Sequence, residues 1–97
     1  MQLTERQRKH LRRLAHHMKP VVQVGNSGLT DSLVAELNSS LTRHELIKIK
    51  VHVGNRDLRD KTIDELSRIT GAEIIQRVGN TASLFRPRQE NPGITLP

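Results

Sequence analysis

The chain has 97 residues, a length that suits one compact domain with its own core. It has no cysteine and no apolar run near the roughly 20 residues of a membrane span, so we expect a cytoplasmic protein without disulfides or thiolate chemistry. Sixteen Lys and Arg against ten Asp and Glu give a net charge of +6, and Arg outnumbers Lys by 11 to 5, which favours a phosphate-bearing partner.

The first expected element is an amphipathic helix from Thr4 to about His17. Thr4 and, three residues on, Gln7 form the capping-box pattern that starts a helix. Apolar residues recur at helical spacing and predict its buried stripe, Leu11, Leu14, Ala15 and Met18. The remaining arc carries five cations, Arg6, Arg8, Lys9, Arg12 and Arg13. Because like charges at this spacing repel, the arc is either a solvated face or a face for partner phosphates.

A strand, a glycine turn and a second helix are expected next. Pro20 precedes Val21–Val24, which predicts a strand covered on both faces. After the turn Gly25-Asn26-Ser27-Gly28, Thr30 or Asp31 caps a helix to about Thr42, with the stripe Leu33, Val34, Leu37 and Leu41. Such a turn aims backbone N–H groups and a helix N-terminus at one point and attracts an anion. Alternatively, its glycines merely permit positive φ.

The segment Leu46–Val53 alternates between apolar and polar residues and predicts a second strand. Its core-facing side chains are Ile47, Ile49, Val51 and Val53. The opposite face carries Lys48, Lys50 and His52, so we expect it to be open and basic.

A third helix and a hairpin complete the expected domain. The helix runs from about Asp57 to Thr70 and stops at Gly71, with the stripe Thr62, Ile63, Leu66 and Ile69. The acids Asp57, Asp60, Asp64 and Glu65 could form the metal site of a nuclease, but half of them are explained as surface pairs, Asp57–Lys61 and Asp64–Arg68, which the sequence favours. Ala72–Val78 and Thr81–Arg86 are strands joined by Gly79-Asn80 in a type II′ turn. Residues 89–97 are expected to form a flexible C-terminal tail, with Ile94 and Leu96 resting on the body.

This order, α-β-α-β-α-β-β, predicts an α/β fold of the α+β two-layer type. The βαβ crossovers make the first three strands parallel to one another. The hairpin makes the last strand antiparallel to them, so the sheet is four-stranded and mixed.

Four separated motifs agree in order and spacing with a known family. They are residues 14–22 (LAHHMKPVV), 25–30 (GNSGLT), 44–50 (HELIKIK), and 70–72 (TGA) with the closing 79–87 (GNTASLFRP). Over residues 3 to about 88 the chain resembles the CRM domain (chloroplast RNA splicing and ribosome maturation), and more narrowly its free-standing bacterial YhbY-like members. The resemblance implies a fold related to the C-terminal domain of bacterial translation initiation factor three. It also implies that residues 1–88 are a single RNA-binding domain, and that bacterial members associate with precursors of the large ribosomal subunit.

The resemblance carries the family's RNA-contacting loop to residues 25–28 and its basic strand to Lys48 and Lys50. With the helix cations and Lys19, the expected RNA-binding residues are Gly25, Asn26, Ser27, Gly28, Arg6, Lys9, Arg12, Arg13, Lys19, Lys48 and Lys50. Asn26 and Asn80 stand where many relatives carry lysine, which implies weaker or more polar binding of the same kind.

The main hypothesis is a monomeric, non-enzymatic RNA-binding protein that assists large-subunit assembly. Phe85 is the single aromatic residue, so we expect binding through the RNA backbone and shape rather than stacking platforms. An alternative is an adaptor whose basic face docks on an acidic protein partner. An enzyme would have to use the five histidines, of which His16 and His17 point to different sides of a helix. We expect no catalytic residue, metal or cofactor.

Overall fold

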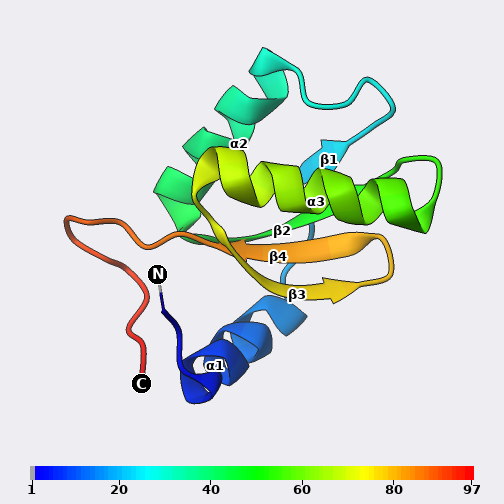
Figure 1. Cartoon of the computed structure of the whole chain (residues 1–97). Helices are drawn as coiled ribbons and strands as arrows, with labels where there is room; N and C mark the ends of the chain where they lie inside the picture. Colours follow the sequence, from blue (N-terminus) through cyan, green and yellow to red (C-terminus); the bar gives the residue numbers. More distant parts are fainter. Residues whose placement is uncertain (1) are drawn as a thin grey trace.

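The computed structural model describes residues 2–97 (Figure 1). Its elements are α1 (Glu5–His16), β1 (Val22–Val24), α2 (Asp31–His44), β2 (Leu46–Val51), α3 (Arg56–Thr70), β3 (Glu73–Val78) and β4 (Thr81–Phe85). The expected order is confirmed, and the expected boundaries differ from these by one or two residues. The capping box of Thr4 and Gln7 is present, and Gly71 ends α3 in the left-handed conformation.

The four strands form one mixed sheet in the order β1-β2-β4-β3. β1 runs parallel to β2, and β4 lies between β2 and β3 and is antiparallel to both, so the first three strands share one direction as predicted. Gly79 has φ +58° while Asn80 has no positive φ, which is the combination that a type II′ turn requires.

The prediction that β1 is covered on both faces is wrong. β1 is an edge strand, so only its Val22 and Val24 side chains are buried, and Val21 before it is 46% exposed. The apolar run is explained by a single covered face and a short strand. At this edge, the outer N–H and C=O groups of β1 have no strand within residues 2–97 to pair with.

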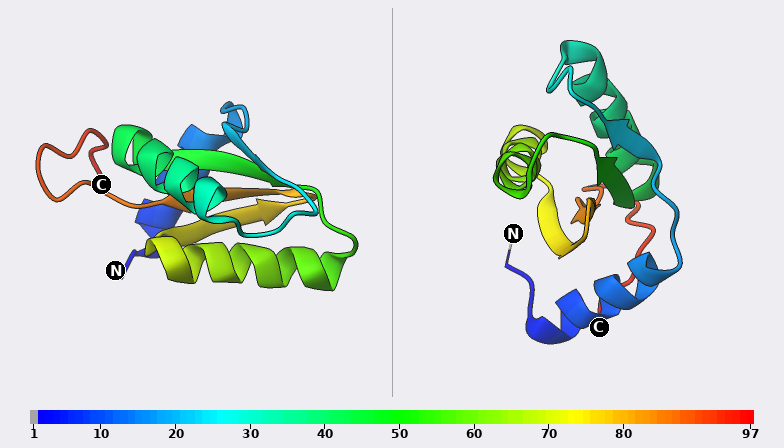
Figure 2. Two further views of the ribbon diagram at one scale, coloured as in Figure 1. Left: turned by 90° about the horizontal axis from the view of Figure 1, so that it is seen from above. Right: turned by 90° about the vertical axis from the view of Figure 1, so that its right-hand side faces the viewer.

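Helices cover both faces of the sheet, which makes three layers where two were expected (Figure 2). The larger core lies between the sheet and the helices α2 and α3, and includes Leu37, Ile49 and Leu66. A second cluster lies between α1 and the opposite face, and consists of Leu11, Ala15, Leu46, Ile75 and Phe85. The expectation of a wholly open basic face on β2 is therefore wrong at Leu46, where α1 covers the sheet, and holds only further along the strand.

Two residues of the predicted helix stripes are exposed rather than buried. Leu14 is 42% exposed and Ile69 is 40% exposed. At about 100° per residue, the buried face of α1 is centred between Leu11 and Ala15, which places Leu14 on its flank. In α3 the buried face includes Leu66 and Thr70, and Ile69 lies beside it for the same reason.

The predicted surface pairs within α3 are also replaced by others. The guanidinium group of Arg77 in β3 contacts Asp64 and lies 3.4 Å from the Asp60 carboxylate. Arg68 pairs with Glu65 instead of Asp64. Arg77 reaches the helix because it points to the sheet face that α3 covers. Some acids of α3 thus pair with Arg77 of β3, a contact that spacing along the sequence cannot predict.

The tail is attached to the domain through the buried carboxylate of Glu45. This side chain is 1% exposed and accepts hydrogen bonds from the backbone N–H groups of Arg88 (2.8 Å), Gly93 (2.7 Å) and Ile94 (3.0 Å). Burial alone raises the pKa of Glu45, but these three N–H donors outweigh it and leave the pKa below its usual value. Ile94 and Leu96 then pack against the α1 side of the sheet, as predicted.

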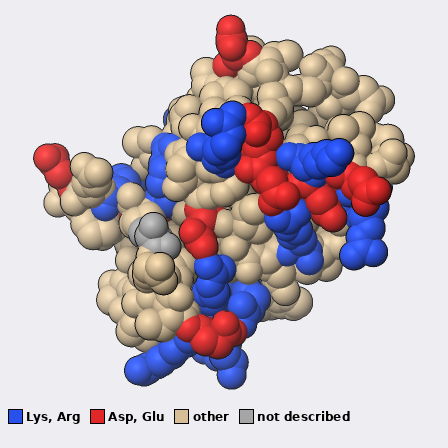
Figure 3. Space-filling view, viewed as in Figure 1, with Lys and Arg blue, Asp and Glu red and all other residues tan. Residues whose placement is uncertain are grey.

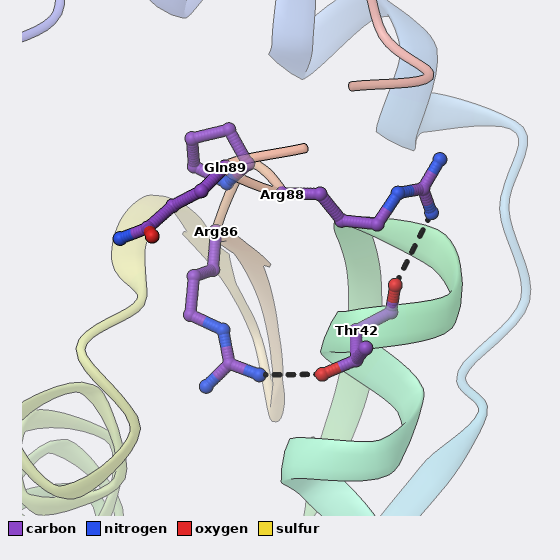
Figure 4. A pocket seen from close by; sticks show the side chains of 5 residues that line it. Thr42, Arg86, Arg88 and Gln89 are labelled. Atoms are coloured by element: carbon purple, nitrogen blue, oxygen red, sulfur yellow. Dashed lines mark hydrogen bonds between the residues drawn. The ribbon is translucent and has the colours of Figure 1, made fainter. Parts of the chain in front are cut away.

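Arg86 and Arg88 tie the C-terminal ends of the helices together around a hollow of about 440 Å³ (Figure 4). Arg86 donates to the Thr70 carbonyl at the end of α3 (2.8 Å) and to Thr42 Oγ1 in α2 (3.1 Å). Arg88 donates to the carbonyls of Thr42 (3.1 Å) and Arg43 (2.9 Å), which have no partner within the helix. Both guanidinium groups are therefore used in hydrogen bonds within the fold, although the hollow that they line is basic.

Candidate nucleic-acid interface

The loop from Gly25 to Gly28 connects β1 to α2 as a tight turn. The Gly28 N–H donates to the Gly25 carbonyl (3.1 Å), and the Thr30 N–H donates to the Gly28 carbonyl (3.2 Å). Thr30 then caps α2, its Oγ1 accepting from the Leu33 N–H at 3.1 Å. Asn26 and Ser27 form the exposed tip, and no hydrogen bond within residues 2–97 uses their N–H groups. Two backbone donors therefore face solvent next to a capped helix start.

The two glycines of this loop have different backbone requirements. Gly28 has φ +74°, a conformation that favours glycine, whereas Gly25 has no positive φ. A Cβ at Gly25 would meet no atom within 4 Å. The fold thus explains glycine at residue 28 and leaves glycine at residue 25 without a structural reason.

The other connections at this end of the sheet lie beside the loop (Figure 1). The His52 N–H donates to the Val24 carbonyl (2.7 Å), and the Val51 N–H donates to the Asn80 carbonyl in the hairpin (2.7 Å). We call residues 25–29, 52–55 and 79–80 the loop end. Asn26 and Asn80 both lie at this end of the sheet.

Lys50 lies next to the loop end, and Lys48 lies two residues further along β2. Lys50 is paired with Gln23 of β1 and Thr81 of β4, and Lys48 is opposite Ser83. Both lysines are half-buried on the face that α1 covers only in part, and neither takes part in the salt bridges found among residues 2–97. We call the uncovered part of this face the open face. Its residues are Gln23, Lys48, Lys50, Gln76, Val78, Thr81 and Ser83.

The cations of α1 fall into two groups. Arg8 pairs with Glu73, and Arg12 pairs with Glu5 at 2.6 Å. The hydrogen bond and charge of Arg12 hold the pKa of the exposed Glu5 carboxyl below its usual value. Arg6, Lys9 and Arg13 are exposed and surround a hollow of about 290 Å³ together with His10 and Pro97. Figure 3 shows basic side chains gathered over the lower edge of the molecule, where α1 lies, and mixed charges over α3.

The structure brings some of the predicted residues together and separates others. Lys50 pairs with Gln23, just before the Gly25–Gly28 loop, and the C-terminal end of α1 approaches Lys48 through His16. Arg6 lies ten residues before His16, about 15 Å away along the helix axis, and Lys9 lies between them. Lys19 is exposed in the connection from α1 to β1. A single small ligand cannot touch all of these residues, whereas an extended polyanion can.

The sequence analysis did not identify one cluster of basic residues. Arg56 and Arg59 at the start of α3, with Arg77 and Gly79, line a hollow of about 340 Å³ beside the β3–β4 hairpin. Arg77 is neutralised by Asp60 and Asp64, but Arg56 is exposed next to the loop end. The cue was present in the sequence, where two arginines flank Asp57 directly after the Gly54-Asn55 break.

Comparisons with known proteins identify the class of protein that this fold and surface belong to. The family model described as the CRS1 / YhbY (CRM) domain matches residues 3–86, so the chain belongs to that family. It is 40% identical over 88 residues to an RNA-binding protein of Haemophilus influenzae, covering 91% of this chain and 89% of that one. It is 33% identical over 95 residues to YqeI of Bacillus subtilis, named a probable RNA-binding protein, covering 98% and 99% of the two chains.

A solved structure agrees with the fold as well. The solution structure of the hypothetical protein SAV1595 from Staphylococcus aureus matches with a TM-score of 0.83 and 33% identity, covering 99% of this chain and all of that one. Within residues 2–97, no helix combines the length and apolar character needed to cross a membrane.

Proposed function

We propose that this protein is a non-enzymatic RNA-binding factor that contacts the RNA backbone through the Gly25–Gly28 loop and the basic residues beside it. The observation that carries the proposal is the pair of exposed N–H groups at Asn26 and Ser27, which follow closely after Gln23, the β1 residue that pairs with Lys50. Backbone donors and a nearby cation are the groups that bind phosphate at a helix start. The names of the relatives as RNA-binding proteins support RNA as the polyanion.

The residues have different roles in this proposal. The loop N–H groups hold one phosphate, and the Asn26 amide or Ser27 hydroxyl bonds a 2′-hydroxyl, which DNA lacks. Lys48, Lys50, Lys19 and the free cations of α1 attract neighbouring phosphates. Arg12 contributes less than Arg13, since Glu5 neutralises it. Residues 1–88 form the binding domain, and residues 89–97 are a tail that packs against it and supplies no cation.

The loop role is tested by two substitutions at one residue. Gly25→Asp adds a negative charge where a phosphate must approach, and Gly25→Ala adds only a Cβ in open space. RNA affinity, measured by fluorescence anisotropy with an RNA stem-loop, should fall at least tenfold for Gly25→Asp and much less for Gly25→Ala. Equal affinities for the wild type and Gly25→Asp would overturn the loop role.

We further propose that the RNA is ribosomal and that the protein acts as a monomer in the cytoplasm during assembly of the large subunit. A cell lysate is separated on sucrose gradients at low and moderate salt, and the protein is detected in each fraction. The proposal requires co-migration with large-subunit precursors that moderate salt abolishes. Ribonuclease treatment before the gradient should release the protein; co-migration with a partner after RNA digestion would instead support docking on an acidic protein.

A further inference from the structure

A hollow of about 430 Å³ lies on the open face, and of its lining residues only Lys48 is used by the binding mode described above. It lies between the C-terminal end of α1 and the strands β2, β4 and β3, and is lined by His16, Lys48, Gln76, Val78, Thr81 and Ser83. The hollow exists because α1 ends at His16, which leaves the sheet uncovered beyond the second apolar cluster. Its size is within the range of about 300–1,000 Å³ typical of sites for small organic ligands.

The side chains that line the hollow suit a ligand that has a planar polar group and a negative charge. Lys48 is the cation, and none of the residues that line the hollow is acidic. Ser83 is 3% exposed and places a hydroxyl at the floor of the hollow. Gln76 adds an amide with both donor and acceptor capacity. Thr81 donates its hydroxyl to the Val78 carbonyl (2.8 Å), which leaves its oxygen as an acceptor.

An apolar surface accompanies these polar groups. Val78 is 58% exposed, the most exposed of the large apolar side chains within the described part of the chain. It stands opposite Thr81 across the β3–β4 pairing, so its methyl groups adjoin the hollow. A flat aromatic ring that lies against Val78 would turn its edge towards Gln76 and Ser83.

We propose that this hollow receives one unpaired nucleotide of the bound RNA. The base lies against Val78 with its edge towards Gln76 and Ser83, and Lys48 binds the adjoining phosphate. The inference rests on the proposed RNA-binding function and names a part of the substrate, because a base that is paired and stacked within a duplex cannot enter a hollow. It predicts a preference for RNA with a bulged or looped nucleotide beside a stem.

The test compares two RNA duplexes with the same base pairs, one fully paired and one with a single bulged nucleotide that adds one phosphate. Affinities are measured by fluorescence anisotropy at one salt concentration. The wild type should bind the bulged RNA about tenfold more tightly, which is the order of magnitude that one or two hydrogen bonds to the base edge contribute. Equal affinities for the two RNAs would overturn the inference and leave the proposed function standing.

Matched variants assign the preference to the hollow. Gln76→Ala should lose most of the preference for the bulge and keep the salt dependence of the wild type, since it removes no charge. Gln23→Ala is the control, because Gln23 is exposed on the same face but does not line the hollow. A bulge preference that survives Gln76→Ala would contradict the inference. Failure of the wild type to bind either RNA would overturn the proposed function and the inference together.

Discussion

The buried carboxylate of Glu45 makes the sharpest prediction about stability. Glu45→Gln keeps the size of the side chain but removes its charge. One oxygen accepts from both Gly93 and Ile94, and the other accepts from the Arg88 N–H at 2.8 Å. If the amide oxygen keeps the first two bonds, the NH₂ group faces the Arg88 N–H, donor against donor. The substitution therefore loses at least one charge-assisted bond.

The magnitude follows from that loss. A hydrogen bond to a charged group contributes about 1.5–3 kcal/mol to stability, so we expect Glu45→Gln to cost about 2 kcal/mol at pH 7. In a domain of this size, the melting temperature should fall by about 8–16 °C. The ion pair with Arg88 adds little, since its N–O distance is 3.8 Å and Arg88 is about one-third exposed.

The pH dependence of the same variant gives an independent check. The native pKa of Glu45 is below the ordinary value of 4.5, so its charge contributes stability that is fully present above that pH. This contribution is lost as the pH falls through the lowered native pKa. Urea unfolding at pH 7 and in steps down to about pH 3 should show the difference between wild type and Glu45→Gln shrinking with acidity. A difference below about 0.5 kcal/mol at pH 7, or one independent of pH, would refute the assignment.

Three further predictions concern the loop, the arginine between the helix ends and the cations of α1. Gly28→Ala should destabilise the fold by about 1–2 kcal/mol in urea unfolding because of its φ of +74°, while Gly25→Ala should stay within about 0.5 kcal/mol; equal costs would contradict the loop conformation. Arg86→Met should lower stability by about 2–4 kcal/mol, since four hydrogen bonds to α2 and α3 are lost, and an unchanged unfolding midpoint would refute that role. In RNA titrations, Arg13→Ala should reduce the salt slope by up to about one unit and Arg12→Ala by less, because Glu5 neutralises Arg12; the reverse order would contradict this division.

Local signals in the sequence were sufficient for the elements of the fold. The capping box of Thr4 and Gln7, the glycine after α3 and the alternation of β2 depend on residues a few positions apart, and each produced the expected element. The side of the sheet that α1 covers could not be predicted in the same way. It depends on Leu46 and Phe85, which come from different strands and form an apolar patch only when β2 and β4 pair.

The candidate site shows the same division between local and distant information. The Gly25–Gly28 loop and the lysines of β2 were identified from the sequence because each lies in one short segment. The sequence could not show which cations of α1 have an acidic partner, since Arg8 pairs with Glu73, sixty-five residues away in the chain. The role of Glu45 was missed for the same reason, because its donors lie 43 to 49 residues further along the chain.

The salt dependence of RNA affinity tests the central proposal most directly. The affinity of the wild type for an RNA stem-loop is measured by anisotropy between about 50 and 200 mM salt, and its logarithm is plotted against the logarithm of the salt concentration. Neutralisation of about five phosphates by the loop, the open face and α1 predicts a slope of about −3.5 to −4.5. A slope near zero would show that phosphate contacts do not drive binding and would contradict the account.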